Sequence, residues 1–252
     1  MASVLIPLPD RDFDVTEVAV PWKVLTEAGH RVVFATEHGT VMPACDPRLL
    51  DGVIFGKLGA RPDAIACYRE LEADPAFRGP VSWRGLDPAA FDGLFLPGGH
   101  AAGMTQYLGS TELHALVAAF WRLAQTTNRP VGAICHGVLV LARAGVLHGR
   151  RTTCLPKYME RSAYLATFWK LGRYYRTYPA YVEDEVKAAL ASPSDFERGP
   201  RTLSARGTRD DDGPAFVVED GTYVSGRWPG DSWKLARAFA ARLDGAQTAR
   251  AA

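Results

Sequence analysis

Short apolar runs alternate along the chain with longer segments in which apolar residues recur every three or four positions. The short runs predict β-strands, and the longer segments predict amphipathic helices. Strands that alternate with such helices build βαβ units. We therefore predict an α/β fold, a doubly wound, flavodoxin-like and mainly parallel sheet with helices on both faces. The predicted strands are 3–8, 31–36, 91–96 and 130–134, and the predicted helices are 14–28, 112–124, 138–144 and 231–243.

The segment of about 40–90 departs from this rhythm, because prolines interrupt it and leave only short helical pieces such as 63–72. We interpret it as a small helical cap inserted into a single domain that spans residues 1–252. Near the C-terminus, two apolar runs flank Asp220-Gly221, a pair that favours a type I′ β-hairpin. The interrupting prolines are Pro43, Pro47, Pro62, Pro75, Pro80 and Pro88.

Composition excludes several classes of protein. With 47 % hydrophobic and 23 % charged residues, the 252-residue chain lies outside the disordered and collagenous classes. Its formal net charge of +1 supplies no strong field for a polyanion, so we expect no nucleic-acid partner. The N-terminus lacks a basic segment before its brief apolar run, and no stretch is long enough for a membrane span. We therefore expect a cytoplasmic protein without a membrane partner.

Metal and cofactor chemistry has little support in the sequence. The four cysteines form no C-x-x-C pair, so neither a zinc ribbon nor a thioredoxin site is predicted. The histidines His30, His38 and His114 show no convincing ligand spacing. We expect no catalytic metal and no cofactor, and an individual reactive thiol remains open. The cysteines are Cys45, Cys67, Cys135 and Cys154.

One cysteine lies in a pattern typical of a nucleophile. An apolar strand, a small-x-Cys-x-small turn and a helix follow one another in PVGAICHGVLV, residues 130–140. This is the pattern of a nucleophile elbow, in which a strained turn presents one side chain at the sheet edge. Ala133 and Gly137 fit the crowded junction of strand and helix. At the start of that helix, Cys135 would be favoured as a thiolate; the alternative is a buried, inert thiol.

Three motifs together resemble a known family. They are EVAVP at 17–21, FDGLFLPGGH at 91–100 and CHG at 135–137, and they occur in the family's order. The chain resembles the ThiJ/PfpI superfamily, which has the class I glutamine amidotransferase-like fold, from Val4 to about Leu243. The match is greatest to the branch of heat-shock chaperones and glutathione-independent glyoxalases III, which has a Cys-His-Glu triad. The resemblance implies a homodimer.

Glu17 has two interpretations. Asp14-Val15-Thr16-Glu17 can be an approximate capping box, in which Glu17 closes back on the start of the helix. The resemblance instead implies a carboxyl that reaches the sulfur of Cys135 and is protonated beside the thiolate. Two adjacent negative charges repel, so such a carboxyl has a raised pKa and can donate a hydrogen bond.

A thiolate also needs a base and a group that orients the base. In the Cys-His branch of the family the base is the residue after the cysteine, here His136; the alternative is a histidine that caps the helix or faces solvent. His148, in a polar turn, ranks second. The resemblance places Glu160 as the acid that orients the histidine. The alternative for Glu160 is a surface pair with Lys157.

The glycines of the second motif have an implied role in binding. The resemblance implies that the backbone N–H groups of Gly99 and His136 form an oxyanion hole beside Gly98, and such donors stabilise a tetrahedral intermediate by about 3 kcal/mol each. The alternative is a tight turn. We interpret His100 as a wall of the pocket rather than a second base. The aromatic residues of 158–178 are more typical of a core or an interface, and could also line the pocket beside Glu160.

These residues lead to one leading function and two alternatives. The leading hypothesis is a cysteine enzyme that converts methylglyoxal or glyoxal to the hydroxy acid through a Cys135 hemithioacetal. Amide, peptide or isonitrile hydrolysis or hydration by the same sulfur is one alternative. A stress-response holdase or redox sensor, in which Cys135 oxidises to the sulfinate, is the other. Two segments depart from the family pattern, Ala101-Ala102 and Arg227-Trp228-Pro229-Gly230.

Overall fold

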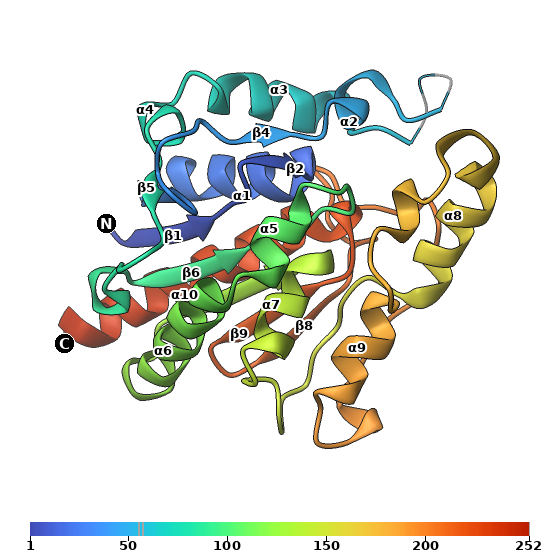
Figure 1. The fold of residues 1–252 in the computed structure, drawn as a ribbon. Helices are drawn as coiled ribbons and strands as arrows, with labels where there is room; N and C mark the ends of the chain where they lie inside the picture. The colour runs from blue at the N-terminus through green and yellow to red at the C-terminus, as the bar shows by residue number, and fades with distance from the viewer. Residues whose placement is uncertain (55, 57, 252) are drawn as a thin grey trace.

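The computed structural model describes residues 1–54, 56 and 58–251. A seven-stranded sheet in the order β5-β3-β1-β6-β7-β9-β8 runs through it (Figure 1). All neighbours are parallel except β8 and β9, which form the predicted antiparallel hairpin. The predicted type I′ turn is wrong, because Asp220 pairs with Tyr223 and, of the two turn residues Gly221 and Thr222, only Gly221 has a positive φ. The strands are β1 Ser3–Pro7, β3 Arg31–Thr36, β5 Val81–Ser82, β6 Gly93–Leu96, β7 Val131–Ile134, β8 Val217–Asp220 and β9 Tyr223–Gly226, with a separate parallel pair of β2 Arg11–Phe13 and β4 Ala44–Cys45.

Ten α-helices and five short 3₁₀ helices occur in the described residues, and none of these helices combines the length and apolar character that a membrane crossing requires. The α-helices are α1 Val15–Glu27, α2 Pro47–Asp51, α3 Pro62–Leu71, α4 Pro75–Arg78, α5 Met104–Gly109, α6 Thr111–Thr127, α7 Val138–Arg143, α8 Lys157–Leu171, α9 Val182–Ala188 and α10 Ser232–Ala251. The 3₁₀ helices are η1 Pro88–Ala90, η2 Cys135–Gly137, η3 Tyr174–Arg176, η4 Pro193–Asp195 and η5 Pro229–Asp231.

Helices cover both faces of the sheet, which confirms the predicted fold class. Tyr223 and Gly226 lie three positions apart in β9, so they face opposite sides of the sheet. The ring of Tyr223 lies 5.4 Å from that of Trp121 in α6. A Cβ on Gly226 would stand 3.2 Å from Leu235 of α10. Helix α1 packs beside α10 on one face, and α7 packs beside α6 on the other.

The predicted elements agree well in the sheet and less well outside it. The strand 31–36 has the predicted bounds, and the first helix lies within one residue of them. Helix α10 continues to Ala251, well beyond the predicted end at 243. Helix α8 was not predicted, because its apolar residues do not gather on one face. Several are exposed rather than in the core: Leu165, Phe168 and Trp169.

The segment 40–90, expected as a cap, is spread over three places. Helix α3 packs against α1, and β5 extends the main sheet by pairing with β3. Leu49, Leu58, Gly59 and Ala60 line the cavity described below. Figure 1 shows α8 and α9 on the side toward which the arrowheads of β1 and β6 point, so this later segment also lies at the carboxyl ends of the strands.

Candidate active site

Cys135 occupies a sharp turn between β7 and α7. Its φ is +57°, a left-handed conformation that costs an L-residue roughly 1–2 kcal/mol. The turn needs small neighbours: a Cβ on Gly137 would stand 2.2 Å from the carbonyl oxygen of Leu96. The chain therefore forms the strand–turn–helix geometry of an elbow around this sulfur.

His136 folds back on its neighbour. Its Nδ1 lies 3.4 Å from Sγ of Cys135, and its ring packs 5.1 Å from that of Tyr178. Adjacent side chains ordinarily diverge, and the left-handed turn at Cys135 brings these two together. Burial, with smaller effects from His100 and Arg143, lowers the pKa of His136 to about 3. The imidazole is therefore neutral at physiological pH, and the same burial makes it a weaker base than a free imidazole.

Glu17 points to the sulfur rather than back to its own helix. Asp14 caps α1, because its Oδ1 accepts the N–H groups of Thr16 at 2.8 Å and Glu17 at 3.1 Å. The carboxyl of Glu17 accepts the N–H of Gly98 at 2.9 Å through Oε2, while its buried Oε1 has no hydrogen-bond partner among the described residues; Glu17 and the Cys135 thiol are close enough to shift each other's pKa. Only the Asp14 half of the predicted capping box is therefore formed.

The charges of Glu17 and Cys135 oppose each other in a buried site. Burial, followed by the charge of Asp14, raises the pKa of Glu17 and so favours the protonated form of this carboxyl. Burial and the charges of Glu17 and Asp14 also raise the pKa of the Cys135 thiol, although the backbone N–H of His136 lowers it. The expectation of a thiolate favoured by the helix terminus is therefore wrong for the unliganded site. The thiol is neutral at rest, and His136 is the neighbouring group that can take its proton.

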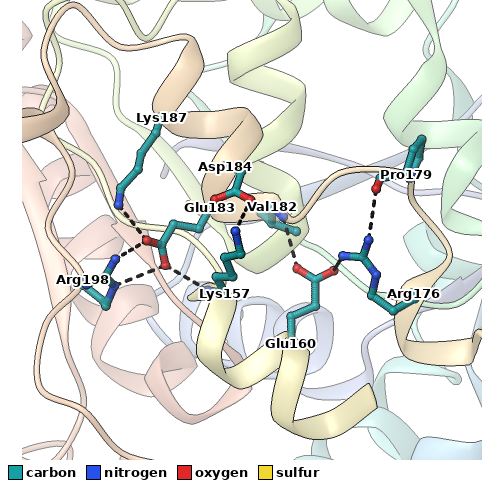
Figure 2. Close-up of polar contacts among 9 residues, drawn as sticks. All are labelled: Lys157, Glu160, Arg176, Pro179, Val182, Glu183, Asp184, Lys187 and Arg198. Carbon is teal, nitrogen blue, oxygen red and sulfur yellow. Dashed lines mark hydrogen bonds and ion pairs between the residues drawn. The ribbon is translucent and has the colours of Figure 1, made fainter. Parts of the chain in front are cut away.

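Glu160 lies in the first turn of α8 and is 4 % exposed. Its Oε2 accepts the N–H of Val182 at 3.1 Å, and its Oε1 lies 3.4 Å from Nη1 of Arg176 (Figure 2). Burial raises the pKa of Glu160 to about 7, against the lowering effects of Val182 N–H and Arg176. Glu160 and His136 line the same cavity, and neither hydrogen bond of Glu160 goes to His136. The proposed surface partner Lys157 pairs with Asp184 instead.

Gly98 lies where no side chain would fit. A Cβ there would stand 2.7 Å from the backbone N of His136 and 2.8 Å from Oε2 of Glu17. Gly99 and His100 follow it and line the cavity. The ring of His100 stacks on Tyr175 at 4.3 Å, and burial lowers its pKa to about 4. The structure thus brings the glycine motif against the elbow, and the oxyanion hole of Gly99 and His136 stays a prediction.

A cavity of about 360 Å³ contains Cys135 and His136 in its wall. This volume lies in the range of roughly 300–1,000 Å³ typical of small-molecule sites. Its polar wall residues include Asp14, Glu160 and Arg206. Much of the remaining wall is apolar, with Leu49, Leu155, Met159, Ala163, Ala166 and Trp228.

Comparison with known proteins assigns the family. A family model described as ThiJ/PfpI family-like matches residues 8–200. The chain belongs to the ThiJ/PfpI family. It is 30 % identical to Deglycase PfpI of Pyrococcus furiosus, over 92 % of this chain and 94 % of that protein. An uncharacterized protein of Schizosaccharomyces pombe is 29 % identical, over 94 % and 82 %. The crystal structure of glyoxalase III from Candida albicans superposes with a TM-score of 0.67 at 18 % identity, covering 96 % of this chain and 97 % of that one.

The remaining candidates of this ThiJ/PfpI family member lie apart from the cavity. His148 is exposed in its turn and is not among the wall residues. Among the residues that the structure describes, no three His, Cys, Asp or Glu side chains group as metal ligands. Two wall residues were missed from sequence, Arg206 and Trp228. The only signal for Trp228 was the departure of its motif from the family pattern, and Arg206 lies in a coil without periodicity.

Proposed function

We propose that this ThiJ/PfpI family member is a cysteine enzyme that converts small α-oxoaldehydes, such as methylglyoxal or glyoxal, to 2-hydroxy acids. One observation carries the proposal: Sγ of Cys135 lies 3.4 Å from Nδ1 of a neutral His136 in the wall of a cavity. Glu17, whose protonated form is favoured by its raised pKa, interacts with the same sulfur. A nucleophile, a base and a proton donor are the groups that this isomerisation requires.

The reaction balances without an external oxidant or reductant. Sγ of Cys135 adds to the aldehyde carbon C1 while His136 takes the thiol proton and passes it to the carbonyl oxygen, giving a hemithioacetal. His136 then removes the hydrogen from C1 as a proton and returns it to C2, while the hydroxyl proton on the C1 oxygen moves to the C2 oxygen. This step oxidises C1 to a thioester and reduces C2 to an alcohol. Water attacks C1, the C1–S bond breaks, and Cys135 regains its proton as the hydroxy acid leaves.

Glu17 supports this sequence by donating a hydrogen bond to the sulfur when the sulfur is an anion. A hydrogen bond to a charged acceptor is about twice as strong as one between neutral groups. The roles of Glu160 as orienting acid and of Gly99 and His136 N–H as oxyanion hole belong to the same proposal. Glu160 would act through its contacts with Arg176 and Val182, which position the segment facing His136.

A second candidate is deglycation, the activity in the name of the Pyrococcus furiosus relative. The observation that favours it is the size of the cavity, which is far larger than methylglyoxal requires. In that reaction the same sulfur would act on an oxoaldehyde joined to an amine or thiol. The two candidates share Cys135 and differ in whether the aldehyde arrives free or as an adduct.

The test is lactate formation from methylglyoxal without glutathione. We expect turnover by the wild type and by Cys67→Ala, a control that removes a different buried cysteine in α3. We expect no turnover by Cys135→Ala. Release of the free amine from a methylglyoxal adduct, measured in parallel, distinguishes deglycation from direct conversion.

A further inference from the structure

One cation in the wall of the cavity has no part in the proposed reaction. Arg206 lines the same cavity as Cys135. Its side chain is partly buried, and its Cζ lies 4.7 Å from the ring centroid of Trp228, a second wall residue. Within the described part of the chain, Arg206 forms no ion pair with a carboxylate. An arginine stacked on an indole is fixed in orientation while its N–H groups stay free to donate.

The stack is built into the fold through Gly230. A Cβ on Gly230 would stand 2.5 Å from the ring of Trp228 and 2.7 Å from Cβ of Arg206, so both residues pack directly on this backbone. The carbonyl of Gly230 also accepts the N–H of Gly207 at 2.8 Å. This bond joins the coil that carries Arg206 to the turn that carries Trp228. Any side chain at position 230 would displace one of the two.

A buried ion pair holds the same turn. Arg227 and Asp231 are both 0 % exposed and form a two-point pair, Nε to Oδ2 at 2.8 Å and Nη2 to Oδ1 at 2.9 Å. Asp231 also accepts the N–H groups of Phe216 and Arg227. Breaking such a pair is costly, so the turn has one strongly preferred conformation. The segment Arg227-Trp228-Pro229-Gly230, which departs from the family pattern, is therefore ordered where it lines the cavity.

The positive charge of Arg206 is not neutralised where it meets the cavity. Burial and the neighbouring charge of Arg61 lower the pKa of Arg206, against the charges of Asp14 and Asp63. Neither carboxylate forms an ion pair with Arg206: Oδ1 of Asp14 accepts two backbone N–H groups, and Oδ2 of Asp63 accepts the Nε1–H of Trp233 at 3.1 Å. A partly desolvated guanidinium gains most from an acceptor of opposite charge with planar geometry.

We propose that Arg206 determines specificity by binding a carboxylate of the substrate. The substrate of Cys135 is then an oxoaldehyde, free or as an adduct, whose carbonyl end is joined through an apolar body to a carboxylate. The apolar body lies against Leu155, Met159 and Trp228, and the carbonyl lies at the sulfur. This inference rests on the proposed function for its reaction, while the anion site itself can be tested without turnover.

The experiment compares matched acids and amides with the full-length protein. The substrates are 3- and 4-carboxyphenylglyoxal, their carboxamides, and methylglyoxal as an uncharged reference. The variants are Arg206→Gln, Arg206→Lys and, as a matched control, Arg201→Gln, which removes an exposed arginine of the same coil that stacks on Tyr158. We expect wild type and Arg201→Gln to prefer an acid over its amide by at least tenfold in kcat/KM, mainly through KM. Arg206→Gln should lose this preference, so that kcat/KM for each acid falls to that for its amide, and Arg206→Lys should keep part of the preference.

A binding measurement separates this inference from the proposed function. Calorimetry with unreactive 3- and 4-acetylbenzoate and the corresponding acetylbenzamides reports the anion site whether or not the enzyme turns over. Tighter binding of an acid by wild type, lost in Arg206→Gln, supports the carboxylate site even if methylglyoxal is not converted. Equal affinities for every acid and its amide, or an acid preference that survives in Arg206→Gln, would overturn it even if methylglyoxal is converted.

Discussion

The backbone N–H of Gly98 donates a hydrogen bond of 2.9 Å to Oε2 of Glu17, a residue 81 positions away. This bond ties helix α1 to the loop after β6 and sets the carboxyl beside the sulfur of Cys135. The same glycine lies against the backbone N of His136. Gly98 therefore joins the three motifs on which the family resemblance rested.

Gly98→Ala should disrupt this junction. Its Cβ would stand 2.7 Å from the backbone N of His136, and neither this backbone nor Glu17 can move without losing the site. We expect a loss of about 1–3 kcal/mol in the free energy of unfolding, as for an overpacked core, and at least a 100-fold loss in kcat/KM. Gly109→Ala is the control, because a Cβ there meets nothing within 4 Å. Equal behaviour of the two variants in denaturant titration and kinetics would contradict the role of Gly98.

Glu17→Gln should separate stability from activity. Because folding raises the pKa of Glu17, the folded state binds this proton more tightly than the unfolded state does. The wild type therefore loses stability relative to Glu17→Gln as pH rises above 4.5, and the difference should grow with pH until Glu17 is ionised in the folded protein. Glutamine keeps the acceptor for Gly98 but cannot exchange a proton, so we expect kcat/KM to fall about 100-fold or more. A stability difference independent of pH would show that Glu17 ionises freely in the folded protein.

Glu160 and Glu183 are two buried carboxylates with separate sets of polar contacts, both shown in Figure 2. Glu160 lines the cavity and has a pKa of about 7, so wild-type kcat/KM should rise from pH 6 to 8 as it ionises. Glu160→Gln should remove this rise and lower kcat/KM about tenfold. If Glu183→Gln gives the same kinetic change per folded molecule, the role assigned to Glu160 is wrong.

Glu183 should act on stability alone. Burial alone would raise the pKa of Glu183. Hydrogen bonds from Arg198, Lys187 and the N–H of Lys157 outweigh this effect and lower the pKa to about 2. This lowered pKa stabilises the folded state by about 3 kcal/mol above pH 4.5. The stabilisation is lost as the pH falls from 4.5 toward 2. Urea titrations from pH 7 to 2 should show this decline in the wild type and a weaker one in Glu183→Gln. Parallel declines would contradict it.

Two exposed aromatic residues of α8 allow a test of the holdase alternative. Phe168 is 50 % exposed and Trp169 is 63 % exposed, and neither lines the cavity. We expect Phe168→Ser with Trp169→Ser to leave methylglyoxal turnover within twofold of wild type. Light scattering by a heat-denatured client protein should be measured on the same variant and on Cys135→Ala. Suppression of aggregation that depends on α8 and not on Cys135, in a protein without turnover, would favour the holdase.

The sheet and the elbow could be predicted from the sequence because both depend on local patterns of residue type. The apolar run of 31–36 and the glycine at Gly137 are read directly from residue type and spacing. Glu17 was ambiguous because a cap and an active-site carboxyl look alike in sequence, and only the distant Gly98 N–H decides between them. The charge state of Cys135 was misjudged for a related reason: burial outweighs the helix terminus, and burial of one atom is a property of the whole fold.

The cavity-wall residues Arg206 and Trp228 could not be predicted from the pattern of residue types along the chain. Arg206 and Trp228 lie in segments without periodicity, and they meet only because Gly230 permits close packing. The partners of Glu160 likewise come from later in the chain, Arg176 and Val182. Contacts between irregular segments depend on the three-dimensional path of the chain, which spacing does not encode.

The central claim is that the sulfur of Cys135, served by His136, is the reacting atom. The most direct measurement is lactate production from methylglyoxal without glutathione by the wild type, Cys135→Ala and Cys67→Ala. The account predicts lactate from the wild type and Cys67→Ala and none above the uncatalysed rate from Cys135→Ala. Full turnover by Cys135→Ala, or no turnover by folded wild type, would contradict it.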